Sequence, residues 1–352
     1  MKVIGTILRD KVREPIQKEI MRNNQVVMVT GASAGLGRAI AHAFAKRGAR
    51  IGLIARNEEA LEACRREVED LGGEALVLPL DVSDAAAVDV AASRLEETFG
   101  PLDVWVNDAM LSVFSPVHEM KAEEYKRVTD VTYLGYVYGT LAALHRMRPR
   151  DRGTIIQVGS ALSVRSIPLQ SAYCAAKHAI VGFTDSLRCE LYHEDSNIQV
   201  TVVQMPAMNT MQFTWVKSRL PNKPQPVPPI FQPEVAAEVV VHAAQADSPR
   251  REYWVGSPTV EAMLGQMVVP GLLDRYLGKT GFQAQQTDVP DNPDRPNNLW
   301  QYVPGKHRAR GPFDNRSHTF SPQVFADLHR GWFIGAGVLM LAAGAAFASK
   351  RK

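Results

Sequence analysis

Three side chains that can take part in proton transfer stand close together in the sequence. Tyr173 and Lys177 lie four residues apart in the segment Ser-Ala-Tyr-Cys-Ala-Ala-Lys, and Ser160 precedes Tyr173 by thirteen residues. On a helix, residues four apart share one face. A phenol is a poor acid unless a neighbouring cation favours its ionised form, and Lys177 could supply that cation. The pair could therefore exchange a proton with a substrate oxygen, although such pairs more often serve packing or the surface.

A second motif combines a strand, a glycine-spaced turn and a helix. The apolar run Val26–Val29 is typical of a buried parallel strand, and the segment from Leu36 to Lys46 is expected to be helical. Between them stands Thr-Gly-Ala-Ser-Ala-Gly-Leu-Gly, residues 30–37. Glycines there let a pyrophosphate approach the backbone at the helix N-terminus. The alternative is that they only let the helix pack closely on the strand.

With these motifs the chain resembles the short-chain dehydrogenase/reductase family over about residues 25–257. Five motifs follow the family's order: TGxxxGxG, Asp81-Val82 after the third strand, Asn107-Asp108-Ala109 after the fourth, Ser160, and the YxxxK of Tyr173 and Lys177. The resemblance implies an α/β fold with a Rossmann-type doubly wound parallel sheet in a single catalytic domain. The alternation of apolar strands and helices along the chain agrees with this architecture.

The resemblance also implies a reaction and roles for the residues. Hydride transfer would interconvert a ketone and a secondary alcohol, as in dehydrogenases and reductases acting on CH–OH groups. Tyr173 would be the general acid or base, Lys177 would lower its pKa and bind the nicotinamide ribose, and Ser160 would bind the substrate oxygen. Thr132 stands where the family usually has an Asn that helps to hold a water linked to the lysine. We expect its hydroxyl or a backbone carbonyl to hold that water.

The second strand, Arg50–Asn57, ends with a cation. An acidic residue there would bind the ribose 2′-hydroxyl of NAD, whereas Arg56 suits the 2′-phosphate of NADP. NADP(H) is therefore favoured and NAD(H) remains possible; a solvated arginine beside a helix is the alternative. The resemblance implies cofactor contacts by Gly31, Ser33, Gly35, Leu36, Gly37, Arg56, Asp81, Val82, Asn107, Ala109, Tyr173, Lys177, Pro206 and Thr210.

Two further departures from the family pattern lie near the cofactor region. Met110 stands where the family commonly has glycine, and Pro206-Ala207 replaces the usual Pro-Gly. Neither removes the proton-transfer side chains, so an oxidoreductase is the prediction. The alternative is a membrane-attached NADP-binding sensor or scaffold with little catalysis, which Thr132, Asp108 and Met110 favour.

The segment after Pro206 is rich in methionine and aromatic residues, namely Met208, Met211, Phe213, Trp215, Val216 and Leu220. In this family the segment usually covers the substrate, so we expect a small lipophilic carbonyl or alcohol as substrate. A dimer contact or the core of a lid is the alternative. A helix is expected over Pro233–Gln245, and one more over Val260–Leu277.

Composition divides the chain into five parts. An N-terminal amphipathic extension covers residues 1–24, and the Rossmann-fold catalytic domain covers residues 25–281. Prolines among polar residues, including Pro290, Pro293, Pro296, Pro304 and Pro312, predict an extended, poorly helical tether over residues 282–330. Its aromatic residues Trp300, Tyr302, Phe313 and Phe320 could dock onto the domain. A transmembrane helix is expected over residues 331–349, and residues 350–352 form a basic tail.

The membrane prediction depends on the run Trp332–Ala348, which contains no charged residue. Its length as a helix is close to the lower limit for crossing a bilayer. We expect a C-terminal membrane anchor with the catalytic domain facing the cytoplasm, where NADP is found; a buried terminal helix is the alternative. The basic, amphipathic N-terminal extension could rest on an anionic membrane or pack on the domain.

The charge balance excludes one class of partner. The net charge of +3, from 40 basic and 37 acidic residues, is too small and scattered for nucleic-acid binding. Three cysteines and nine histidines show no ligand spacing, so no metal is expected. In the family, helices corresponding to Ala122–Arg146 and Ala172–Tyr192 commonly pair between subunits, which predicts a homodimer or homotetramer.

Overall fold

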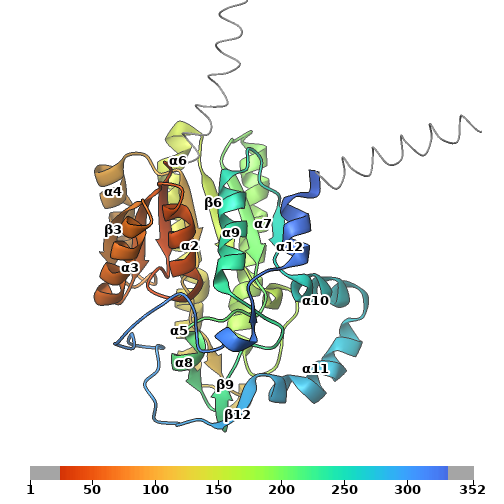
Figure 1. Ribbon diagram of the computed structural model, residues 1–352. Coiled ribbons are helices and arrows are strands. Elements are labelled where there is room, and N and C mark those ends of the chain that lie inside the picture. Colours follow the sequence, from red (N-terminus) through yellow and green to blue (C-terminus); the bar gives the residue numbers. More distant parts are fainter. Residues whose placement is uncertain (1–23, 332–352) are drawn as a thin grey trace, which may run out of the picture.

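Seven parallel strands form the central sheet of the computed structural model, which describes residues 24–331 (Figure 1). Their order is β11-β7-β6-β4-β1-β2-β3. Their bounds are β1 Val26–Thr30, β2 Arg50–Ala55, β3 Glu74–Pro79, β4 Val104–Asn107, β6 Thr154–Val158, β7 Gln199–Gln204 and β11 Glu252–Trp254. The chain reverses its direction of winding between β1 and β4, where a parallel sheet of this kind opens a crevice at the strand ends. The predicted Rossmann-type sheet is confirmed.

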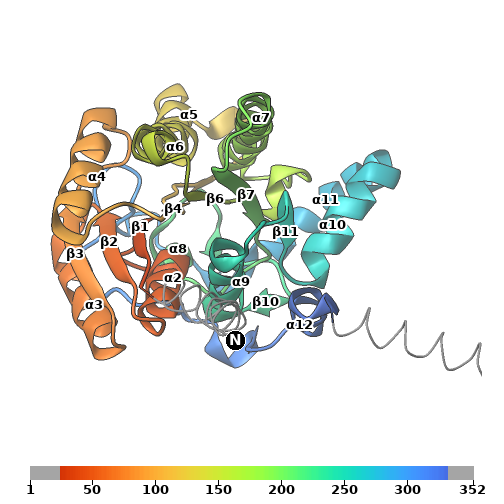
Figure 2. The ribbon, with the colours of Figure 1, turned by 90° about the horizontal axis from the view of Figure 1, so that it is seen from above.

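Helices cover both faces of the sheet (Figure 2). Val27 and Val29 of β1 belong to one apolar cluster, whereas Val26 and Met28 belong to the other. This alternation follows from the two-residue period of a strand. The first cluster includes residues of α2 Gly35–Ala45, α3 Glu58–Asp70 and α9 Pro233–Gln245; the second includes residues of α4 Ala85–Phe99, α6 Gly135–Met147 and α7 Ser171–His193.

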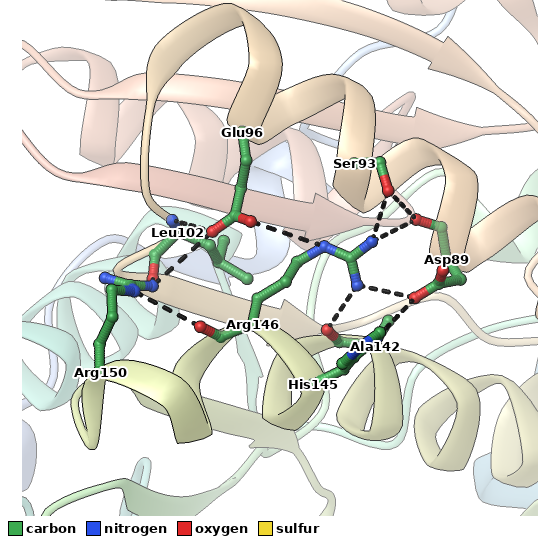
Figure 3. A network of polar contacts seen from close by, with 8 residues as sticks. All are labelled: Asp89, Ser93, Glu96, Leu102, Ala142, His145, Arg146 and Arg150. Carbon is green, nitrogen blue, oxygen red and sulfur yellow. Dashed lines mark hydrogen bonds and ion pairs between the residues drawn. The ribbon is translucent and has the colours of Figure 1, made fainter.

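Polar contacts join α4 to α6 beside the second cluster (Figure 3). The Arg146 guanidinium donates to Asp89 Oδ1 and to Ser93 Oγ, at 2.7 Å each. Its side chain is almost fully buried, so these acceptors offset the cost of removing the charge from water. Arg150 donates to the Leu102 carbonyl at 2.7 Å and ties the end of α6 to the start of β4.

The segment between β4 and α6 contributes Met110, Leu111 and Val131 to the wall of the cavity described below. It contains β5 Val113–Phe114, a short 3₁₀ helix Val117–Glu119, α5 Ala122–Thr129 and a π-helical turn Asp130–Leu134. The turn leads directly into α6. A π turn shifts the register of a helix, and such turns are frequent at functional sites.

Short elements follow β7 around the crevice. They are α8 Gln212–Trp215, β8 Lys217–Ser218, β9 Asn222–Pro224 and β10 Ile230–Phe231, followed by the predicted helix at Pro233–Gln245. The single helix predicted over residues 260–277 is wrong, because two helices, α10 Ser257–Val268 and α11 Pro270–Ala284, meet there. Pro270 lacks an amide hydrogen and cannot continue the first helix. Met263 is buried, whereas Met267 and Leu272 are exposed, so most apolar side chains of this stretch lie outside the core.

The polar segment from residue 286 to residue 331 lies against the domain. Only α12 Pro322–Leu328 and a 3₁₀ turn Asp314–Arg316 are helical. β12 Gln286–Pro290 pairs antiparallel with β9, and β13 Ser317–His318 pairs in parallel with β10. Val324 of α12 joins the apolar cluster that contains α9. The segment is extended and poor in helix, as the tether prediction has it, but among the described residues it wraps back over the domain.

Across residues 24–331, no helix combines the length and apolar character that a membrane crossing requires. The predicted transmembrane helix and basic tail lie outside the described residues, apart from Gly331, and so does the predicted N-terminal extension, apart from Asn24.

Candidate active site

A cavity of about 590 Å³ lies at the carboxyl ends of the central strands. One end, the β2–β3 end, is bounded by residues that follow those two strands; the other, the Tyr173 end, continues between α8 and α11. The expected site residues on its wall are Gly31, Ser33, Gly35, Leu36, Arg56, Asp81, Val82, Ala109, Ser160, Tyr173, Lys177, Pro206 and Thr210. All of these residues therefore lie on the wall of one cavity, where a single ligand could contact them.

The glycines of the β1–α2 turn are required by its geometry. Gly31 and Gly35 have φ angles of +75° and +60°, which side-chain-bearing residues rarely adopt. A β-carbon at Gly31 would come within 3.0 Å of the Ala109 backbone, and one at Gly35 within 3.3 Å of Thr210. A β-carbon at Gly37 would collide with the Gly31 carbonyl. Gly37 thus serves close packing of α2 on the turn, whereas Gly31 and Gly35 face the cavity.

Ser160 and Tyr173 meet at the middle of the cavity. Ser160 follows β6, where its amide donates to Gln204 Oε1 at 2.8 Å, and its side chain is hydrogen-bonded to the Tyr173 phenol. Tyr173 stands in the first turn of α7, where its side chain is partly buried and lines the cavity. Burial raises the pKa of Tyr173, and the hydrogen bond with Ser160 opposes that rise.

Lys177 lies one turn after Tyr173 and is 1% exposed. Its Nζ donates to the Val158 carbonyl at 2.6 Å and to the Tyr136 hydroxyl at 2.9 Å. The Tyr136 hydroxyl itself donates to the same carbonyl at 3.0 Å. The ammonium also lies 5.6 Å from the ring centroid of Tyr173. Helix α7 therefore delivers the phenol and the ammonium side by side, as their spacing predicted.

Asp108 is the acidic partner of Lys177 inside the cavity. Burial lowers the pKa of Lys177, and the negative charge of Asp108 opposes this. Burial likewise raises the pKa of Asp108, and the Lys177 charge and a hydrogen bond from the Gly37 amide oppose that rise. The ammonium is thus hydrogen-bonded to a carbonyl and a hydroxyl, and the charge of Asp108 acts on it without a direct ion pair among the described residues. Neither Tyr136 nor Asp108 was expected as a site residue.

Gly37, expected as a cofactor contact, does not line the cavity, and two further expected site residues do not reach it either. The Thr132 hydroxyl accepts from the Leu111 amide at 2.9 Å and donates to the Leu111 carbonyl at 3.0 Å, so it ties the π turn to the β4–β5 loop. Asn107 accepts from the Trp105 indole at 2.7 Å and donates to Gln157 at 2.9 Å. Both side chains are fully buried, and their contacts are structural. The expected roles of Thr132 in holding a water and of Asn107 beside the cofactor are corrected accordingly.

At the β2–β3 end, Arg56 lies beside the C-terminal segment. Its Nη2 donates to the Asn298 carbonyl at 2.6 Å, and its Nη1 donates to the Trp300 carbonyl at 3.1 Å. Asp81 pairs with Arg127, whose Nε donates to the Leu299 carbonyl at 3.0 Å. Sequence reasoning placed Arg56 and Asp81 here and missed the segment that contacts them.

At the Tyr173 end, the wall is largely apolar and comes from distant parts of the chain. Phe213 of α8 lines it together with Pro226, Leu277 of α11 and Ile167. Glutamines interrupt this apolar surface, among them Gln170, Gln225 and Gln285. Gln170 donates to Gln285 Oε1 at 2.7 Å, and Gln225 Oε1 is buried without a partner among residues 24–331. In the same range, no cluster of three His, Cys, Asp or Glu side chains could hold a metal.

Comparison with known proteins supports a common origin with dinucleotide-dependent enzymes. The family model described as short chain dehydrogenase matches residues 25–219. An uncharacterized oxidoreductase of Bacillus subtilis is 35% identical over 287 residues, which are 81% of this chain and 80% of that protein. A fatty acyl-CoA reductase of Acinetobacter baylyi is 31% identical over 221 residues, 62% of this chain and 72% of its own.

A solved structure has the same architecture. A metagenomic short-chain oxidoreductase in complex with NADP superposes with a TM-score of 0.55 at 30% sequence identity, covering 66% of this chain and 96% of that one. The match of the family model, the long match to the bacterial relative and the geometry of the site agree. This chain belongs to the short-chain dehydrogenase/reductase family of NAD(P)-dependent oxidoreductases.

Proposed function

We propose that this protein is an NADP(H)-dependent oxidoreductase that interconverts a ketone and a secondary alcohol on a lipophilic molecule. One observation carries the proposal. Ser160, Tyr173 and Lys177 meet on the wall of the same cavity that the glycine turn of β1–α2 borders. A dinucleotide binder that performs no chemistry needs the turn but not a buried phenol beside a buried ammonium.

The roles of the three side chains follow from their contacts. The Ser160 hydroxyl binds the substrate oxygen, and the Tyr173 phenol gives it a proton during reduction or removes one during oxidation. Lys177 stabilises the phenolate that remains after proton donation, because its charge lies beside the phenol ring. A bound nicotinamide supplies or accepts the hydride. Burial of Ser160 and Lys177 strengthens these interactions, because little water competes with them.

The chain offers a matching surface for a dinucleotide. The Gly35 and Gly37 amides have acceptors, whereas the Leu36 amide, also in the first turn of α2, has none among the described residues. An amide at that position can donate to a phosphate oxygen. Arg56 at the end of β2 favours a 2′-phosphate, and the similar metagenomic oxidoreductase was crystallised with NADP. The adenosine then occupies the β2–β3 end and the nicotinamide the Tyr173 end.

The substrate class follows from the wall beyond Tyr173. Aromatic and aliphatic side chains form most of it, so burial of an apolar molecule there is favourable. The relative from Acinetobacter baylyi is described as a fatty acyl-CoA reductase, which supports an aliphatic substrate. The unpaired Gln225 Oε1 favours a molecule with a hydrogen-bond donor some distance from its carbonyl group.

Titration of the full-length protein with NADPH and NADH, followed by nicotinamide fluorescence, tests cofactor binding directly. Lipophilic and hydrophilic ketones are then added to the NADPH complex. We expect tighter binding of NADPH and oxidation only with lipophilic ketones, and we expect Tyr173→Phe to bind NADPH normally without turnover. Binding without turnover by the wild type on every ketone would argue for a sensor, and turnover of hydrophilic ketones alone would exclude the proposed substrate class.

Membrane attachment and assembly are separate proposals that rest on sequence. The uncharged run Trp332–Ala348 would hold the protein in a membrane with the catalytic domain in the cytoplasm. Extraction of cell membranes at alkaline pH tests this, because an integral protein stays in the pellet. A homodimer or homotetramer paired through α5, α6 and α7 is expected by family resemblance, and sedimentation of the detergent-solubilised protein measures it.

A further inference from the structure

Residues 297–311, here called the C-terminal strap, cross the β2–β3 end of the cavity. In Figure 1 the blue coil after β12 passes below α3 and α2 before it reaches α12. Backbone carbonyls of the strap accept from the Arg56 guanidinium at Asn298 and Trp300. The Arg308 carbonyl accepts from the Gly35 amide at 3.0 Å. The strap is thus fastened to the two places on which a dinucleotide of this family depends.

Additional contacts hold the strap in place. The Leu299 side chain is fully buried in the apolar cluster beneath α4 and α6, and its carbonyl accepts from Arg127. The Arg38 guanidinium donates to the His307 carbonyl at 2.8 Å. The ring of His307 lies 4.7 Å from that of Trp215 in α8. Side chains of α2, α5 and α8, together with Arg56 after β2, hold this coil against the domain. The strap is therefore an integral part of the fold.

The strap also forms part of the cavity wall. Asn298, Tyr302, Val303 and His307 line the cavity together with Arg56, Asn57 and Asp81. The family model ends at residue 219, well before the strap begins. The part of the cavity wall that the strap forms therefore lies outside the region that the family model describes.

Two buried acceptors on the strap have no partner among the described residues: Asn298 Oδ1 and His307 Nδ1. His307 Nε2 lies 2.8 Å from the Val303 carbonyl and 3.4 Å from the Asn57 amide nitrogen. The shorter contact assigns the proton to Nε2. Burial lowers the pKa of His307, so the ring is neutral at neutral pH and its Nδ1 is an acceptor. An unpaired buried acceptor is unfavourable, and a ligand that brings donors would satisfy it.

We propose that the strap is part of the dinucleotide site, with Asn298 and His307 accepting hydrogen bonds from the adenosine of the bound cofactor. An adenosine carries its donors on the amino group of the base and on the ribose hydroxyls, which suits two acceptors. The strap then encloses the adenosine, and the cofactor leaves only when the strap moves away. This inference rests on the proposed dinucleotide-dependent function.

The test compares NADPH affinity among full-length variants by nicotinamide fluorescence. His307→Phe retains an aromatic ring against Trp215 and removes both ring nitrogens, and Asn298→Ala removes the second acceptor. Asn315→Ala, on an exposed turn of the same C-terminal segment and away from the cavity, is the control. Each of the first two changes should weaken NADPH binding by about three- to tenfold, the effect of one lost hydrogen bond. The control should bind as the wild type does.

Two competing ligands distinguish a lost adenosine contact from a general loss of the site. Adenosine 2′,5′-bisphosphate should lose affinity by the same factor as NADPH, whereas nicotinamide mononucleotide should not. Unchanged affinities in both variants would overturn the inference and leave the proposed function intact. If the wild type bound neither NADPH nor NADH, the proposed function itself would fail.

A measurement on the unmodified protein covers the case in which the variants fold poorly. Lys306, Arg308 and Arg310 are exposed trypsin sites on the strap. Saturating NADPH should slow cleavage at these sites at least severalfold, because cleavage requires the strap to leave the domain. Equal cleavage rates with and without bound NADPH would contradict the enclosure of the cofactor.

Discussion

The two ends of the cavity are built from different parts of the polypeptide. At the Tyr173 end, the proposed chemistry resides in side chains of α7 and of the turn after β6, which stand close together in sequence. At the β2–β3 end, the closing wall consists largely of backbone carbonyls from a strap far along the chain. Side chains leave a pattern in the sequence, whereas a carbonyl can come from any residue. Residue types therefore predict the functional groups at the Tyr173 end, but they do not predict the carbonyls that close the β2–β3 end.

The largest effect is expected at the Tyr173 end. Lys177→Met removes the charge beside the phenol while retaining a flexible chain of similar length. Turnover should fall by about a thousandfold, within the range attributed to general acid–base catalysis, and NADPH affinity should change much less. Measurement of kcat and of the dissociation constant for NADPH separates the two. A variant that keeps more than a tenth of wild-type turnover would show that Tyr173 does not depend on this ammonium.

Arg56→Ala tests the β2–β3 end, where one side chain has two assigned tasks. If Arg56 binds the 2′-phosphate, the change should weaken NADPH binding on the order of tenfold more than NADH binding. If it only holds the strap, both nucleotides should lose affinity equally. The ratio of the two dissociation constants decides between these outcomes. Arg275→Ala on the exposed surface of α11 is the matched control and should leave both constants unchanged.

Tyr136→Phe sharpens the account of the Tyr173 end. The Tyr136 hydroxyl accepts from Lys177 Nζ and so favours the charged ammonium. Its loss should lower the pKa of Lys177, so the charge disappears at a lower pH. For ketone reduction, the alkaline limb of the profile of kcat/KM against pH should move to lower pH, and kcat should fall by about tenfold. Tyr138→Phe, two residues away on α6, is the control; an unshifted profile in Tyr136→Phe would refute the role.

Asp108→Asn should have the smallest effect, on cofactor affinity. The carboxylate ionises as pH rises and then opposes a pyrophosphate near Gly31 and Gly37, beside which it lies. The amide oxygen of Asn can still accept from Gly37. The variant should therefore bind NADPH about three- to fivefold more tightly than the wild type at alkaline pH, with the difference vanishing at acid pH. Dissociation constants at several pH values measure it, and a constant ratio would show that the charge of Asp108 does not act on the cofactor.

The sequence predicted the sheet and the proposed catalytic trio of Ser160, Tyr173 and Lys177 because their signals are local. Periodic apolar runs identify strands, and the spacing of Tyr173 and Lys177 already assigns them to one helix face. Thr132 was misplaced because the π turn Asp130–Leu134 changes which residues of that helix point toward the cavity. Asp108 belongs to the Asn107-Asp108-Ala109 motif, but the sequence does not show that α7 places Lys177 where the two charges affect each other. The strap was predicted to be a tether because prolines and polar residues are typical of an extended chain. This composition is the same whether the chain is free or docked on the domain.

The contact between Arg38 and the His307 carbonyl joins residues 269 positions apart. During synthesis the β1–α2 turn leaves the ribosome long before its partner residues are made. A nascent chain that has reached α7 already contains the whole catalytic trio, yet its cofactor groove is still open on the β2–β3 side. An mRNA truncated after the codons of α11 would thus encode a polypeptide that has Ser160, Tyr173 and Lys177 but lacks the strap that closes the cofactor groove.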